Sequence, residues 1–277
     1  MKKKIVILCG VMIFGFTLLR HDARAAESVH ISENKDNYSI TQTDDGSDSD
    51  VYFGWSWKDS KWYYYEETDM EHPGEMVKDC IMTIKGEKYL FDANGCMLTG
   101  WQKRPEGWYY ADTNGRIQTG WQYIKGYWYF LQSDGVMAEE WLQLDNKWYY
   151  LGSNGAMKTG WQYIKGYWYF LQPNGAMACD WLKQNGKWYY LGSNGAMKTG
   201  WQLVGDKWYF LNSNGAMACN WLYRNGPWYY MGSDGAMKTG WQAVKGVWYY
   251  LESDGHMATG WKKINNIWYY LNDSGQM

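Results

Sequence analysis

Paired tryptophans recur along most of the chain, and their ring faces are suited to recognising a ligand. The first member of each pair falls every 20 residues from Trp101 to Trp261, and the second follows seven residues later, from Trp108 to Trp268. These nine pairs use eighteen of the 21 tryptophans. An indole face attracts organic cations through its quadrupole. The spacing therefore predicts one small aromatic site per repeat.

Residues that could carry out a reaction are scarce. The chain has no His/Glu/His zinc motif, no Gly-x-Ser-x-Gly elbow and no Cys-x-x-Cys pair. Outside the repeats and an expected signal peptide only residues 26–50 remain, which are too few to bury a catalytic core. We therefore expect no enzyme activity, no cofactor and no metal site.

The composition excludes several classes of protein. There are 21 Trp, 26 Tyr and 7 Phe, whereas disordered chains are poor in aromatic residues. The formal net charge is −2, so no basic field points to nucleic acid. The mean hydropathy of −0.61 shows that no large aliphatic core accompanies these rings.

Each repeat favours a β-hairpin, because it is too short for a helix and a strand together. The second tryptophan opens a triplet, Trp-Tyr-Tyr or Trp-Tyr-Phe, that prefers strands. Asn185-Gly186, Asn225-Gly226 and Asp145-Asn146 stand between two such runs, where Asn-Gly is a strong hairpin signal. A lone hairpin is marginal in water, so we expect an all-β repeat β-solenoid of stacked hairpins.

The pattern weakens toward the N-terminus. Residues 101–277 form a regular array, whereas residues 51–100 hold degenerate repeats. Ile81 and Lys88 replace the two tryptophans of one unit, so a site there is doubtful. Trp55 and Trp62 keep the spacing of seven residues but have no matching successor.

A second period, twice as long, lies over the first. Phe170 and Phe210 alternate with Tyr150 and Tyr190 at the end of the triplet. Pairs of hairpins that face different neighbours would produce this alternation. Duplication of a block of two repeats would produce it too, and the sequence leaves both open.

Alternation along a strand predicts how the rings are shared. Trp148 and Tyr150 point to one face and Tyr149 to the other. A groove lined by two tryptophans and a ring of the next repeat is an aromatic box that suits a quaternary ammonium. A tryptophan at fixed spacing is more often part of a core, but one edge can pack while one face stays open.

The repeats resemble the choline-binding repeats, also called cell-wall-binding repeats, of Gram-positive surface proteins. Gly160-Trp161-Gln162, Trp168-Tyr169-Phe170 and Gly175-Ala176-Met177 carry the resemblance, which extends over residues 51–277. It implies a left-handed β-solenoid with choline or phosphocholine of teichoic acids docked between consecutive hairpins. It also implies sites of two tryptophans, an aromatic residue of the next repeat and often a nearby methionine.

Carried over by position, each site takes the third triplet residue of the next repeat, a choice that depends on the same-face argument. The predicted sets are Trp101, Trp108 and Phe130; Trp121, Trp128 and Tyr150; Trp141, Trp148 and Phe170; Trp161, Trp168 and Tyr190; Trp181, Trp188 and Phe210; Trp201, Trp208 and Tyr230; Trp221, Trp228 and Tyr250; and Trp241, Trp248 and Tyr270.

The N-terminus is typical of an exported protein. Residues 1–25 hold Lys2 to Lys4, an apolar stretch from Ile5 to Leu19 and small residues around Arg24, as in a signal peptide. Fifteen apolar residues are short for a membrane span. Residues 26–80 carry 14 acidic and 4 basic side chains, and we expect residues 26–50 to be a flexible acidic leader.

Four cysteines follow the signal peptide. Cys80 and Cys96 flank one hairpin, and an exported protein permits a disulfide between them. Cys179 and Cys219 occupy equivalent places two repeats apart, a separation we expect to exceed the span of a disulfide.

These features predict a secreted, non-catalytic protein held non-covalently on the cell wall through choline, with no membrane span after cleavage. Two alternatives stay open. Related repeats bind glucan or other glycans, and Gln122, Gln162, Gln202 and Gln242 are polar groups that could hold sugar hydroxyls in an adhesin. The array could also be a structural spacer that presents the acidic leader.

Overall fold

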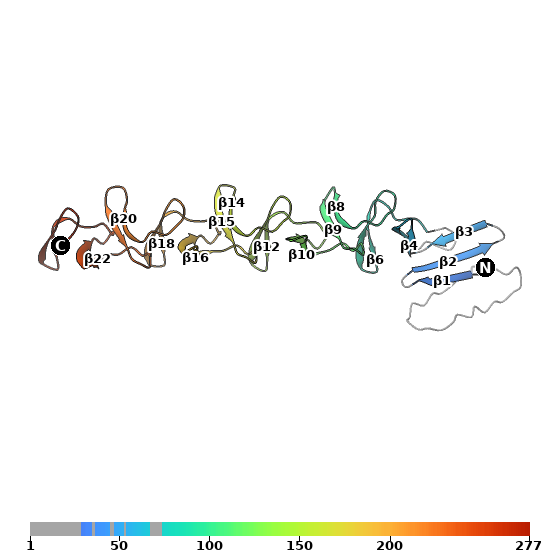
Figure 1. Cartoon of the computed structure of the whole chain (residues 1–277), viewed down its shortest axis with the longest axis horizontal. Coiled ribbons are helices and arrows are strands. Elements are labelled where there is room, and N and C mark those ends of the chain that lie inside the picture. The colour runs from blue at the N-terminus through green and yellow to red at the C-terminus, as the bar shows by residue number, and fades with distance from the viewer. Residues whose placement is uncertain (1–28, 35–36, 45–46, 53, 67–73) are drawn as a thin grey trace. The chain divides into compact units, whose positions relative to one another are not determined.

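A computed structural model describes residues 29–34, 37–44, 47–52, 54–66 and 74–277 (Figure 1). Every regular element in these ranges is a β-strand. The chain divides into two compact units. One holds residues 1–100 and 111–117, and the other holds residues 101–110 and 118–277. The expected signal peptide lies outside the described residues.

The first unit opens with a three-stranded antiparallel sheet in the order β1-β2-β3. The strands are β1 (Val29–Asn34), β2 (Asn37–Asp44) and β3 (Ser47–Tyr52). This is the stretch in which we expected a flexible leader. The β-branched residues Ile40, Thr41 and Thr43 favour extended backbone at the centre of the sheet, despite the acidic composition.

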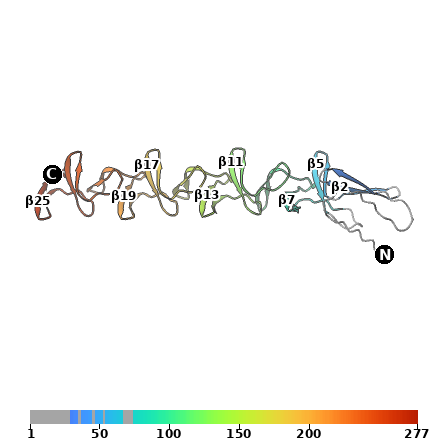
Figure 2. The same ribbon diagram turned by 90° about the horizontal axis from the view of Figure 1, so that it is seen from below.

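All the other strands in the described residues pair as antiparallel hairpins (Figures 1 and 2). They are β4 (Gly54–Lys58) with β5 (Lys61–Tyr65), β6 (Ile81–Ile84) with β7 (Glu87–Leu90), β8 (Gly100–Arg104) with β9 (Gly107–Ala111), β10 (Gly120–Ile124) with β11 (Tyr127–Leu131), β12 (Glu140–Leu144) with β13 (Lys147–Leu151), β14 (Gly160–Ile164) with β15 (Tyr167–Leu171), β16 (Asp180–Gln184) with β17 (Lys187–Leu191), β18 (Gly200–Val204) with β19 (Lys207–Leu211), β20 (Asn220–Tyr223) with β21 (Trp228–Met231), β22 (Gly240–Val244) with β23 (Val247–Leu251), and β24 (Gly260–Ile264) with β25 (Ile267–Leu271).

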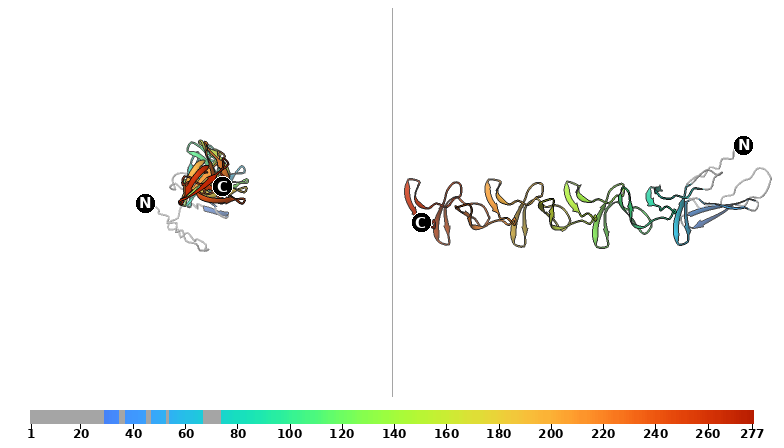
Figure 3. Two further views of the ribbon diagram at one scale, coloured as in Figure 1. Left: turned by 90° about the vertical axis from the view of Figure 1, so that its left-hand side faces the viewer. Right: turned by 90° about the horizontal axis from the view of Figure 1, so that it is seen from above.

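Each hairpin from β10 to β25 is a separate two-stranded sheet, so the second unit is a succession of ribbons in chain order (Figure 3). This confirms the predicted all-β repeat, in which one hairpin forms for each pair of tryptophans. The left hand of the solenoid stays an expectation from the family resemblance.

The hairpin turns follow the predicted chemistry. In β16–β17 the last pair is Gln184 with Lys187, and the two turn residues Asn185 and Gly186 have φ of 49° and 75°. Positive φ at both positions is the mark of a type I′ turn, which matches the twist of the strands. Asp145 and Asn146 turn in the same way, with φ of 48° and 60°.

The third predicted turn is longer. The ladder of β20 and β21 ends at Tyr223 and Trp228, so Asn225 and Gly226 lie inside a four-residue loop. Pro227 has no N–H to donate, and only the bond from the Arg224 N–H to its carbonyl remains, at 3.0 Å.

In each hairpin from β10 to β25 one side chain is completely buried. It follows the aromatic triplet, so the most deeply buried positions of these hairpins are aliphatic residues and one methionine rather than tryptophans. These residues are Leu131, Leu151, Leu171, Leu191, Leu211, Met231, Leu251 and Leu271.

Steric contact explains the Gly-x-Met end of each repeat. Gly155 has φ of 73°, and a Cβ built on it would collide with Sδ of Met137. Met137 is held there by its N–H, which donates to the Trp108 carbonyl at 2.7 Å. Glycine is therefore needed both for the left-handed backbone and for the sulfur that packs against it.

The period of two repeats seen in the sequence corresponds to an alternation in how successive hairpins pack. Phe170 of β15 packs with Ala178 and with Leu182 and Leu191 of the next hairpin, β16–β17, in one hydrophobic cluster. Phe210, Ala218 and Leu222 form the same arrangement two repeats further along the chain.

Glutamine stands in place of Leu182 and Leu222 in the hairpins that carry Phe170 and Phe210. The Gln162 side-chain amide donates to the Thr159 carbonyl at 2.9 Å instead of packing in a cluster. Gln122, Gln202 and Gln242 make the same bond to Thr119, Thr199 and Thr239. The unit of packing is therefore a pair of unlike hairpins, one of the two explanations left open above.

None of the four cysteines in the described residues forms a disulfide, so the bond considered between Cys80 and Cys96 is absent from the structure. Cys96 is buried, and its thiol lies 3.4 Å from the Tyr63 hydroxyl. Cys179 and Cys219 are largely exposed, and the partial burial of their sulfurs raises the pKa of both thiols.

Candidate aromatic cages

Two tryptophans of each hairpin form a corner on one of its faces. In β12–β13, Trp141 pairs with Tyr150 and Gln143 pairs with Trp148, which puts Trp141 and Trp148 on the same face as diagonal neighbours. Their ring centroids are 6.3 Å apart and the planes meet at 86°. Trp148 is 40% exposed. The corner thus presents two ring faces at right angles, with one of the rings open to solvent.

The third ring comes from the next hairpin, but it is not the residue predicted. Tyr169 lies 4.9 Å from Trp141 between ring centroids, at 68°. Phe170, the predicted partner, packs instead on Trp161 of its own hairpin at 5.3 Å and is only 8% exposed. The middle residue of the triplet closes the cage, and the third residue supports the tryptophan from behind.

The same correction applies to every predicted set. Phe130, Tyr150, Phe170, Tyr190, Phe210, Tyr230, Tyr250 and Tyr270 each contact the first tryptophan of their own hairpin. The rings that reach back to Trp101, Trp121, Trp141, Trp161, Trp181, Trp201, Trp221 and Trp241 are Tyr129, Tyr149, Tyr169, Tyr189, Tyr209, Tyr229, Tyr249 and Tyr269.

The error has a simple geometric cause. The same-face argument holds within one hairpin, where Trp148 and Tyr150 do share a face. Successive hairpins meet head to tail, however, so one face of a unit contacts the opposite face of the next, as in any heterologous contact. The face that carries Tyr169 therefore meets the tryptophan face of the hairpin before it.

In the cage around Trp181, a methionine and a carboxylate lie beside the three rings. A cavity of about 220 Å³ is lined by Trp181, Trp188, Tyr209, Met217 and Asp234. The Met217 N–H donates to the Trp188 carbonyl at 2.8 Å, which fixes the thioether beside the rings. The resemblance implied the methionine. The sequence analysis missed Asp234, which stands where most repeats carry asparagine, for example Asn214.

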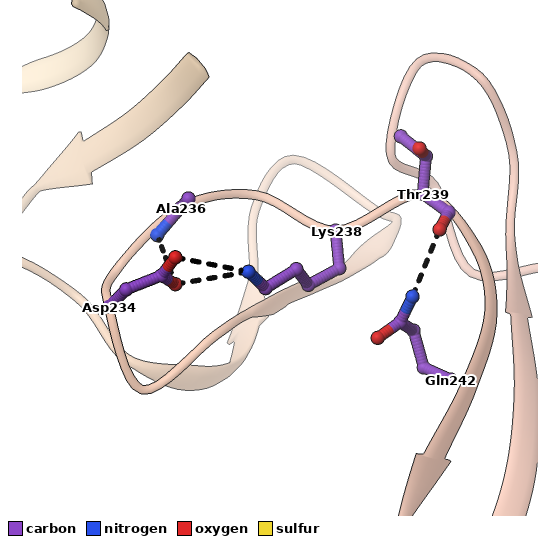
Figure 4. Close-up of polar contacts among 5 residues, drawn as sticks. All are labelled: Asp234, Ala236, Lys238, Thr239 and Gln242. Atoms are coloured by element: carbon purple, nitrogen blue, oxygen red, sulfur yellow. Dashed lines mark hydrogen bonds and ion pairs between the residues drawn. The ribbon is translucent and has the colours of Figure 1, made fainter.

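Asp234 is held as a carboxylate. Its oxygens lie 3.1 and 3.2 Å from Lys238 Nζ, and the Ala236 N–H donates to it at 3.1 Å (Figure 4). Burial raises the pKa of Asp234, but the bonds from Lys238 and Ala236 and the charges of Lys238 and Lys207 outweigh it and leave the pKa below its usual value. At neutral pH Asp234 is therefore ionised, and its carboxylate is paired with the Lys238 ammonium.

The first unit contains a cage that sequence reasoning missed. Trp55 and Trp62 meet at 6.3 Å and 87°, and Tyr89 lies 4.8 Å from Trp55. The Met97 N–H donates to the Trp62 carbonyl at 2.8 Å, as in the regular repeats. Tyr89 occupies the middle of the triplet, next to Lys88 in the place of tryptophan. The tyrosine of this degenerate triplet is therefore the ring that follows Trp55 and Trp62, although the repeat lacks the tryptophan.

Glutamines proposed to hold sugar hydroxyls are engaged locally. Each donates an amide N–H to a threonine carbonyl three residues earlier, as described for Gln162. They support the bend that leads into the strand.

No residue of the described part lies in a helix long and apolar enough to cross a membrane.

Comparison with known families identifies the repeat. A family model described as a choline-binding repeat matches residues 77–116, 118–159, 158–199, 198–239 and 238–277. Each match spans two hairpins, in agreement with the pair of unlike hairpins as the packing unit. A search of curated proteins finds no match.

Solved structures of Streptococcus pneumoniae proteins are similar over most of this chain. CbpJ of strain TIGR4 is 31% identical, with a TM-score of 0.66 over 90% of this chain and 99% of that one. Choline binding protein F, solved in the presence of a peptidoglycan analogue, is 31% identical, with a TM-score of 0.63 over 90% of this chain and 98% of that one. The modular autolysin LytC is 27% identical, with a TM-score of 0.54 over 81% of this chain and 52% of that one.

Proposed function

Because this chain belongs to the choline-binding repeat family, we propose that it is an exported, non-catalytic protein that attaches to the bacterial cell wall by binding choline of teichoic acids in cages between consecutive hairpins. The three rings around Trp141 are the observation that carries the proposal. Two tryptophans at 86° and a tyrosine at 68° surround a small space from three directions. A trimethylammonium group presents methyls in all directions and matches such a space.

The chemistry of the walls favours a cation over a sugar. Ring faces attract a poorly hydrated cation, and the carboxylate of Asp234 adds an opposite charge in one cage. A sugar needs donors and acceptors aimed at its hydroxyls, and the glutamines suggested for that role bind threonine carbonyls instead.

Weak single sites are compatible with firm attachment. Each ring contributes about 0.5–2 kcal/mol toward a cation. After the costs of association, three rings give roughly millimolar affinity for one choline. A polymer that carries many cholines engages several cages at once, and its overall affinity rises by about 10²–10⁴ through effective concentration.

Export is part of the same proposal. The basic and apolar segments of residues 1–25 are typical of a signal peptide, and wall choline is reached only from outside the cell. Fractionation of producing cells would place the protein on the surface, with release by free choline.

Tryptophan fluorescence tests the proposed ligand. The protein is titrated with choline chloride, with tetramethylammonium as a second cation and dextran as a glycan. We expect saturable changes in the millimolar range with both cations and none with dextran. A response to dextran alone would refute the choline proposal in favour of glycan binding, and no response to any of the three would favour a structural spacer.

A further inference from the structure

One position at the cage rim varies from repeat to repeat while the cage rings stay constant. It lies two residues after the first tryptophan, and it faces the second tryptophan across the hairpin, as Lys183 pairs with Trp188 and Tyr163 with Trp168. Both side chains are exposed beside their tryptophans. This position therefore lies beside one wall of its cage.

Lysine at the position places a positive charge against a cage wall. Lys183 Nζ lies over the Trp188 ring, 5.6 Å from its centroid. Lys103 stands over Trp108 at the same distance. An ammonium group there repels a bare quaternary ammonium, unless the ligand also carries an anion that the lysine can pair with.

The Trp181 cage carries both signs of charge. Asp234 lines its cavity together with Trp181, and Lys183 stands at its rim on Trp188. A ligand with a cation at one end and an anion at the other matches this pair of charges. A phosphorylated choline is such a zwitterion, whereas choline itself supplies only the cation.

The Trp161 cage has the same shape without the charges. Tyr163 lies 5.2 Å from Trp168 at 49° and is 63% exposed, so it adds a fourth ring at the rim. Asn214 takes the place of Asp234 in the repeat. An uncharged, ring-rich rim has no partner for a phosphate.

We infer that the residue two positions after the first cage tryptophan determines ligand preference, so that the Lys183 and Lys103 cages select polymer-borne phosphocholine while the Tyr163 cage takes choline and phosphocholine alike. This inference rests on the proposed function and adds a specificity-determining residue to it. The array then holds two kinds of cage. The cage with tyrosine at this position recognises only the ammonium, whereas a cage with lysine recognises both the ammonium and the phosphate.

Site-resolved titration tests the inference. The indole N–H signals of Trp188 and Trp168 in ¹⁵N-tryptophan protein are followed during titration with choline chloride and with phosphocholine. We expect the ratio of phosphocholine to choline affinity to be about two- to fivefold higher at Trp188 than at Trp168, the range of an exposed ion pair. The difference should shrink in high salt.

Variants test whether Lys183 itself causes the difference in the ratio of phosphocholine to choline affinity. Lys183→Gln should bring the ratio at Trp188 to that at Trp168. Lys187→Gln is the matched control, because Lys187 is exposed on the same hairpin and pairs with Gln184 rather than with a cage residue. Tyr163→Lys is the reciprocal variant and should raise the ratio at Trp168. Thermal unfolding confirms that each variant is folded.

The outcomes distinguish this inference from the proposed function. Equal ratios at Trp188 and Trp168 in the unmodified protein would overturn the inference and leave choline binding intact. A Lys183→Gln variant that binds both ligands more tightly by the same factor would also overturn it, since the lysine would then be a competitor for the ring. Absence of any shift with either ligand would refute the proposed function itself.

A membrane lipid can present the same zwitterion, so a second arm separates the sources. The protein is applied to phosphocholine-derivatised resin and, separately, pelleted with phosphatidylcholine vesicles. We expect retention on the resin that is weakened in Lys183→Gln, and no cosedimentation with vesicles. Cosedimentation that the same variant abolishes would overturn the assignment to a polymer.

Discussion

Glu140 holds a left-handed backbone conformation that other repeats give to glycine. Its φ is 61°, close to the 71° of Gly160 at the same place in the next repeat. A side chain in this region costs about 1–2 kcal/mol. Glycine avoids this cost, but the larger conformational entropy that it loses on folding offsets part of the gain. Glu140 also pairs with Lys165 at 3.1 Å, where both side chains are largely exposed.

Replacing Glu140 by glycine should therefore stabilise the protein. We expect Glu140→Gly to gain about 0.5–1 kcal/mol in the free energy of unfolding, because relief of the strained φ exceeds the loss of an exposed ion pair. Urea unfolding measures it. Glu140→Ala keeps the strain and loses the same ion pair, so it should be no more stable than the parent. Equal stability of the glycine and alanine variants would show that the backbone is not strained.

Asp234 makes the stability depend on pH in the acid range. Its pKa is lowered in the folded protein, so its contribution to stability is complete above its unfolded value near 3.8 and is lost as the pH falls through the folded value. The difference in melting temperature between the parent and Asp234→Asn should be constant from about pH 5 to pH 7 and should narrow below about pH 4. A difference that stays constant down to pH 2 would contradict the lowered pKa.

At the scale of the hairpin, two adjacent aromatic residues of one strand make different contacts. Tyr209 closes the cage around Trp181, whereas Phe210 is 4% exposed and packs with Ala218 and Met231. Alternation along β19 sends the two rings to opposite faces. One face therefore contacts the preceding hairpin through Tyr209, and the other packs through Phe210 against Met231 of the following hairpin.

Alanine variants of these neighbours should behave oppositely. Phe210→Ala should cost about 3 kcal/mol in unfolding free energy, as a large buried ring does. Tyr209→Ala should leave most of the stability but remove the choline response of Trp181. Thermal unfolding and the indole signal of Trp181 measure the two effects. If Phe210→Ala abolished the response in a folded protein while Tyr209→Ala preserved it, the third triplet residue would be the cage wall after all.

At the scale of the whole molecule, attachment depends on many equivalent cages. The double variant Trp161→Ala with Trp168→Ala should reduce the number of cholines bound by one and weaken retention on a choline polymer only modestly, because the other cages remain. Calorimetric stoichiometry and elution by free choline measure this. Retention that vanished, or an array that unfolded, would contradict independent sites and indicate that ligand and packing are coupled along the repeats.

The sequence by itself determined the repeat, the hairpin and the identity of most cage rings. The regular tryptophan spacing, the strand preference of the triplet and Asn185-Gly186 act over a few residues, so local rules capture them. The paired tryptophans, such as Trp141 and Trp148, follow from the same spacing.

Only the tertiary structure decided which ring closes each cage. Tyr169 rather than Phe170 meets Trp141 because the contact lies between hairpins, and no alternation within a strand reveals which of its faces the next unit will meet. The carboxylate of Asp234 reaches the Trp181 cavity from two hairpins further along the chain, at a distance that periodicity does not convey. The local spacing in the sequence identifies the aromatic residues, whereas the stacking of each hairpin on the next determines which of them share a cage.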